Sequence, residues 1–111
     1  MSNTRTPRII RAFRWTRLLL HLASAFVTLR FAWPRADAAR RHEIAVGWAQ
    51  DLLSILAIRV RCEGRPPPHG RHGAMIASNH VSWADIFAIA SLRHTRFIAK
   101  SEIRDWPLAG W

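Results

Sequence analysis

The chain has very little of three things: cysteine, acidic residues near its start, and long apolar runs. Its single cysteine, Cys62, has no partner for an internal disulfide, and no Cys-x-x-Cys pair is present to bind structural zinc. A disulfide framework and a zinc ribbon are therefore excluded, and a reducing compartment fits best. Half of the 111 residues are apolar and 22% are charged, which excludes collagen-like and wholly disordered chains. A folded or membrane-associated chain of one domain at most remains.

The first 36 residues contain seven arginines and no acidic residue, so most of the net charge of +10 lies there. On a helical wheel, three of these arginines lie opposite an apolar stripe: Arg8, Arg11 and Arg14 against Ile9, Phe13 and Leu20. This pattern predicts a helix that lies among anionic lipid headgroups. A solvated basic face on a protein core and a mitochondrial presequence are the alternatives. Nucleic acid is disfavoured as a partner, because the aromatic residues lie in apolar stripes and form no stacking platform.

The longest apolar run, residues 18–29, is too short to cross a bilayer. As a helix it covers roughly 18 Å of a hydrocarbon core of about 30 Å. Pro34 is expected to stop this helix, and Asp37 to cap a second one that runs to about Ala57. The apolar positions of the second helix recur every three to four residues, at Ile44, Trp48, Leu52 and Ile55. Residues 1–57 are thus predicted to form a basic, amphipathic, membrane-interfacial helical hairpin.

Residues 58–111 are expected to begin an α/β domain. Residues 58–63 alternate between apolar and charged side chains, which predicts a half-buried strand with Cys62 as a small core residue. Residues 74–78 and 96–100 are two further expected strands, and Ala84–Leu92 is an expected helix between them. A metal site is conceivable at Cys62, His69, His72 and His80, but their irregular spacing and the scarcity of carboxylates favour solvated loop histidines and no metal.

The sequence Asn79-His80-x4-Asp85 lies where the second expected strand meets the helix. A carboxylate five residues after a histidine reaches the imidazole only if the chain bends between them, and it would then fix the tautomer of a general base. The alternative is structural, because Ser82 and Asp85 also have the spacing of a helix capping pair. Ser82 is not expected to be a nucleophile, because its context is not that of a nucleophile elbow.

A second block follows, Lys100-x-Glu102-x4-Pro107-x2-Gly110. Together the two blocks resemble those of the glycerolipid acyltransferases of the 1-acylglycerol-3-phosphate acyltransferase type. The resemblance implies that His80 is the general base and Asp85 its orienting partner. It places Asn79, Lys100 and Glu102 on the substrate-binding side of the site, with Lys100 holding the phosphate of the acceptor and Glu102 helping to hold its loop.

The same resemblance implies the reaction and its partners. An acyl group would pass from acyl-CoA or acyl-carrier protein to the free hydroxyl of a lysophosphatidic acid-like acceptor, with no cofactor, beside anionic lipids at the cytoplasmic face of a bacterial inner membrane. The F-P-E-G-T-type block of the family does not follow Trp111. The chain is therefore expected to be the N-terminal part of the enzyme, with an incomplete α/β domain and little activity alone. A non-catalytic basic membrane-binding module is the rival function.

Overall fold

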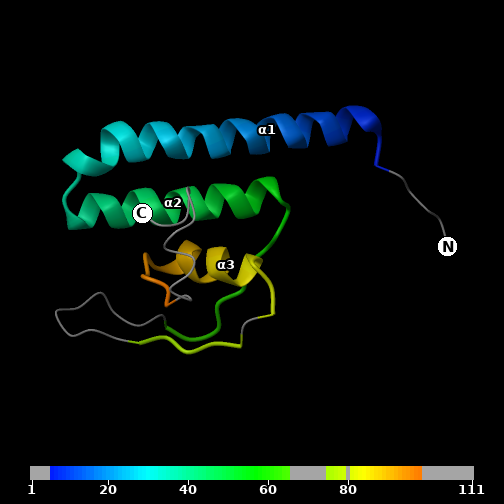
Figure 1. The fold of residues 1–111 in the computed structure, drawn as a ribbon. Helices are drawn as coiled ribbons and strands as arrows, with labels where there is room; N and C mark the ends of the chain where they lie inside the picture. Colours follow the sequence, from blue (N-terminus) through cyan, green and yellow to red (C-terminus); the bar gives the residue numbers. More distant parts are fainter. Residues whose placement is uncertain (1–5, 66–74, 80, 99–111) are drawn as a thin grey trace.

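The computed structural model describes residues 6–65, 75–79 and 81–98. In chain order these form helix α1 (Arg8–Val27), a π-helical turn η1 (Thr28–Ala32), a 3-10 turn η2 (Trp33–Arg35), helix α2 (Ala38–Ile55) and helix α3 (Ala84–Leu92). Helices α1 and α2 lie side by side and antiparallel, and α3 packs on α2 on the side away from α1 (Figure 1). The predicted pair of antiparallel helices is therefore present, with α2 as the middle layer, and its location at a membrane interface stays a prediction.

The reversal between α1 and α2 follows from a few local residues. The helical chain tightens into η2 at Pro34, which has no backbone N–H to continue an α-helix. The Asp37 carboxylate then accepts a hydrogen bond of 2.8 Å from the Arg40 amide and caps α2, as predicted. Arg41 fixes the reversal, because its Nε donates to the Trp33 carbonyl oxygen at 3.2 Å and its guanidinium lies 5.5 Å from the centre of the Trp33 ring.

Helix α2 ends two residues earlier than predicted, in a Schellman motif. The Ile58 amide donates to the Leu53 carbonyl oxygen at 2.9 Å, and the Ala57 amide donates to the Ser54 carbonyl oxygen at 3.0 Å. Ala57 occupies the left-handed position of the motif, with a φ of 57°. Glycine is the usual residue there, because a Cβ atom is crowded in this conformation.

The buried apolar side chains of the described residues all come from α2: Ala49, Leu52, Leu53 and Ile55. This agrees with the middle position of α2, and two of these residues belong to the apolar face predicted for it. Helix α1, by contrast, has no buried residue along its length. Its predicted stripe faces solvent, with Ile9 82%, Phe13 61% and Leu20 66% exposed.

The predicted strands are absent from the part of the chain that the structure describes. Residues 58–63 form no strand, and neither do 75–78 and 96–98. A strand exists only through hydrogen bonds to a partner strand, and the described residues offer none. Cys62 is accordingly exposed, so its predicted place in the core is wrong. Helix α3 has the bounds predicted for it, and the described residues are mainly helical.

None of the helices within the described ranges combines the length and the apolarity that crossing a membrane requires.

Candidate active site

The candidate site is built on the turn that leads into α3. Asp85 lies in the first turn of this helix, and its Oδ2 atom accepts hydrogen bonds from the Val81 amide at 2.8 Å and the Ser82 amide at 2.9 Å. The Ser82 hydroxyl in turn accepts from the Ala84 amide at 3.2 Å. These bonds resemble a capping box, except that the Ser82 hydroxyl accepts from Ala84 and not from Asp85, and they satisfy backbone N–H groups that the start of a helix leaves unpaired. The structural interpretation of the Ser82–Asp85 spacing is therefore confirmed.

The bend required by the catalytic interpretation is also visible, from Val81 onward. The Asp85 carboxylate folds back over the turn and reaches the amide of Val81, the residue that follows His80. His80 itself lies outside the described residues, as do Lys100 and Glu102. Asn79 is described, and it is exposed in a segment without regular secondary structure just before the turn. The predicted contact between the imidazole and the carboxylate remains a prediction.

Four aromatic rings connect this turn to the hairpin. The Trp83 and Phe87 rings meet edge to face with centres 5.9 Å apart, and the Phe87 and Trp48 rings are 6.1 Å apart. Trp48 stacks on the His21 ring at 4.5 Å. His21 Nε2 also donates to the Trp48 carbonyl oxygen at 2.9 Å, and Trp48 Nε1 donates to the His21 carbonyl oxygen at 3.4 Å. We call these four residues the ring row.

The ring row was not predicted from the sequence. The spacing of Trp83 and Phe87, four residues apart, places them on one helix face and was a usable signal. No local pattern pairs His21 with Trp48, because they are 27 residues apart and meet only through the hairpin.

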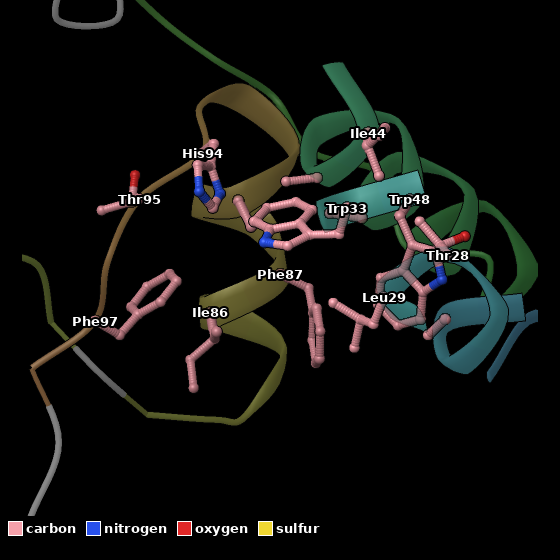
Figure 2. A pocket seen from close by; sticks show the side chains of 14 residues that line it. Thr28, Leu29, Trp33, Ile44, Trp48, Ile86, Phe87, His94, Thr95 and Phe97 are labelled. Atoms are coloured by element: carbon pink, nitrogen blue, oxygen red, sulfur yellow. The ribbon is translucent and has the colours of Figure 1, made fainter. Parts of the chain in front are cut away.

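An apolar cavity of about 370 Å³ lies beside the site, between the hairpin and α3 (Figure 2). Its walls come from the end of α1, the turns η1 and η2, one face of α2, one face of α3 and residues 94–97. Its large side chains include Leu29, Trp33, Trp48, Ile86, Phe87 and Phe97. A cavity of this size and lining suits an apolar ligand group better than a charged one.

His94 is the titratable group in the cavity wall. Its ring meets the Trp33 ring edge to face at 5.5 Å, and its amide donates to Nδ1 of His42 at 3.4 Å. Burial lowers the pKa of His94, and the nearby positive charge of Arg96 lowers it further. The neutral imidazole is therefore favoured against the apolar wall.

The described residues contain no cluster of histidine, cysteine and acidic side chains that suits a metal ion. Three of the four candidate ligands, His69, His72 and His80, lie outside those residues, so the expectation of no metal is not tested.

Comparisons with known proteins agree with the two sequence blocks. Residues 59–111 match the family model described as Acyltransferase. A 1-acyl-sn-glycerol-3-phosphate acyltransferase of Neisseria gonorrhoeae is 37% identical over 111 residues, which are 99% of this chain and 42% of that protein. A similar protein of the same description from Neisseria meningitidis is 34% identical over 110 residues, covering 99% of this chain and 42% of that protein.

A lyso-ornithine lipid O-acyltransferase of Pseudomonas aeruginosa is also similar, with 38% identity over 89 residues, or 79% of this chain and 33% of that protein. The chain thus spans less than half the length of these curated relatives. No solved structure matches it significantly. The matched range contains the turn at Asp85 and both sequence blocks. The chain belongs to the glycerolipid acyltransferase family.

Proposed function

We propose that this chain carries the catalytic turn of an acyltransferase that moves a fatty acyl group from a thioester to the free hydroxyl of a lysophospholipid. The observation that carries the proposal is the capped turn at α3, where the Asp85 carboxylate folds back to the amide that directly follows His80. The similarity to acyltransferases along nearly the whole chain supports it.

In this proposal the His80 imidazole removes the proton from the acceptor hydroxyl. The oxygen attacks the thioester carbonyl carbon, the tetrahedral intermediate collapses, and the carbon–sulfur bond breaks. The imidazolium returns its proton to the departing thiolate, so no acyl-enzyme forms. General base catalysis of this kind contributes about 10²- to 10⁴-fold to a rate.

In this proposal the Asp85 carboxylate both caps α3 and orients the His80 imidazole, and the two roles are compatible. A carboxylate has two oxygens and about four sites that accept hydrogen bonds. The two backbone amides use Oδ2, so capping the helix is compatible with orienting an imidazole through the same carboxylate. The negative charge also favours the imidazolium that forms during the reaction, beside a helix N-terminus that would otherwise disfavour a cation.

The acceptor we propose is 1-acylglycerol-3-phosphate, with Lys100 neutralising its phosphate. A lyso-ornithine lipid is the second candidate, because the Pseudomonas aeruginosa relative is described as acting on that lipid. The test is to supply each acceptor, with acyl-CoA or acyl-carrier protein as donor, to the purified full-length gene product and to identify products by mass spectrometry. Acylation of the phosphate-bearing acceptor supports the proposal. The proposal would be overturned if no combination of acceptor and donor gave an acylated product.

We also propose that α1 holds the protein on an anionic membrane surface, at the cytoplasmic face of the bacterial inner membrane. The exposed apolar side chains of α1 and its unbalanced arginines support this. The test is cosedimentation with vesicles that contain or lack anionic lipid. Replacing Arg11 and Arg14 by glutamine is expected to weaken binding, and the matched control replaces Arg59 and Arg61. Binding without any acyl transfer would favour the non-catalytic module instead.

A further inference from the structure

The Phe87 ring lies between two tryptophans that belong to different helices. It meets Trp83, at the start of α3, edge to face with an interplanar angle of 76°, and it meets Trp48 of α2 at 49°. Both centre-to-centre distances fall in the range in which aromatic pairs attract each other. Phe87 is thus the link between the middle layer and the candidate catalytic turn.

The register of α3 places this link opposite Asp85. Residues four apart lie on one helix face, so Trp83 and Phe87 share a face, whereas Asp85 lies two residues from each and about 200° around the helix. A rotation of α3 that displaced the Phe87 ring from Trp48 would therefore swing the Asp85 carboxylate by the same angle.

The Trp48 side chain is held in place by contacts with α1. The stacking with His21 and the two reciprocal hydrogen bonds hold it to α1. The other end of α3 is held separately, because Gln50 Nε2 donates to the Ser91 carbonyl oxygen at 2.9 Å. The hydrogen bond thus holds the C-terminal end of α3, and the contact between Phe87 and Trp48 lies nearer its N-terminal turn.

The ring row is not simply hydrophobic core. Trp83 is 58% exposed and Phe87 is only partly buried, whereas Leu53 is 3% exposed. The free energy gained by removing apolar area from water is therefore smaller at Trp83 than at Leu53. The rings also meet at defined interplanar angles, 76° for Trp83 and Phe87 and 49° for Phe87 and Trp48.

We propose that Phe87 is a positioning residue, which fixes the orientation of the α3 turn through its contacts with Trp48 and Trp83 and so sets the position of the Asp85 carboxylate. This inference rests on the proposed function. Misplacing a reacting group by about 1 Å can cost 10²-fold in rate, so a residue that never touches substrate can control turnover.

The test is steady-state kinetics of the full-length gene product as a function of pH. Phe87→Leu keeps an apolar side chain but removes both ring contacts. We expect kcat to fall at least about 10-fold with a KM for acceptor within about twofold of wild type. We also expect the acidic limb of the kcat/KM profile to move to lower pH, because a displaced carboxylate stabilises the imidazolium less.

Trp83→Leu is the second variant, and it removes the exposed outer ring at little cost in folding. Trp83→Phe keeps an aromatic edge contact and is expected to restore much of the lost kcat. Leu53→Ala is the matched control, expected to lower thermal stability more than Trp83→Leu does while leaving kcat and the acidic limb unchanged.

The outcomes separate the two proposals. If His80→Ala abolishes turnover but Phe87→Leu and Trp83→Leu keep the wild-type kcat and acidic limb, positioning by the ring row is wrong and the proposed function stands. If His80→Ala retains activity, the proposed function itself fails.

Discussion

Replacing Asp85 with asparagine separates the two jobs proposed for this carboxylate. The asparagine carbonyl oxygen can still accept the Val81 and Ser82 amides that Oδ2 accepts now, at 2.8 and 2.9 Å. What the variant loses is the negative charge that would orient and stabilise a protonated His80.

Asp85→Asn is expected to cost less in folding stability than in catalytic activation free energy. Hydrogen bonds to a charged acceptor contribute about 1.5–3 kcal/mol and neutral ones about 0.5–1.5, while a charge at a helix N-terminus contributes about 0.3–1. Because Asp85 is only partly buried, we expect Asp85→Asn to lower the free energy of unfolding by about 1–2 kcal/mol. Loss of the orienting charge should lower kcat by about 10²- to 10⁴-fold, or about 2.7–5.4 kcal/mol in activation free energy.

The assay is acyl transfer by the full-length gene product at a temperature where each variant is folded, alongside urea denaturation. Ser82→Ala is the matched control, because it removes the 3.2 Å bond from the Ala84 amide and costs about 1 kcal/mol of stability without touching the carboxylate. If Asp85→Asn loses no more activity than Ser82→Ala, Asp85 is only a capping residue and the catalytic role is refuted.

Three further predictions concern stability. Ala57→Gly should raise the free energy of unfolding by up to about 1 kcal/mol in urea, because glycine relieves the crowding at a φ of 57°; a loss would contradict this. Asp37→Ala should lower it by about 0.5–2 kcal/mol, since it removes the cap on the Arg40 amide, and Asp37→Asn should restore most of it. Because the pKa of His94 is lowered in the folded state, its contribution to stability is present above the ordinary histidine pKa of about 6.5 and is lost as the pH falls through the folded value. His94→Gln should therefore flatten the pH dependence of the unfolding free energy over that range, and an unchanged slope would contradict the assignment.

The sequence predicted the helices well because their signals are local. Pro34 and Asp37 are a stop and a cap that act within one turn, and the bounds of Ala84–Leu92 follow from a short apolar segment with a capping pair at its start. The prediction of strands was wrong because a strand depends on residues that are distant in the sequence. Alternation in residues 58–63 shows that a segment can line a sheet, but a sheet also needs a partner strand, and Cys62 is exposed because that segment has none among the described residues.

In the candidate site, too, the local features were predictable from the sequence and the contacts between helices were not. The bend and the capping bonds depend on Ser82 and Asp85, three residues apart, and both were expected. The contact of Phe87 with Trp48 was not, because it depends on how α2 and α3 pack, and no spacing in the sequence encodes that.

We propose that the His80 imidazole removes the proton from the acceptor hydroxyl and that the Asp85 carboxylate orients it. The most direct measurement is the acyl-transfer rate of the full-length gene product carrying His80→Ala, with 1-acylglycerol-3-phosphate as acceptor and an acyl thioester as donor. We expect turnover at the uncatalysed background while the protein remains folded and vesicle-bound. Activity close to that of wild type would contradict it.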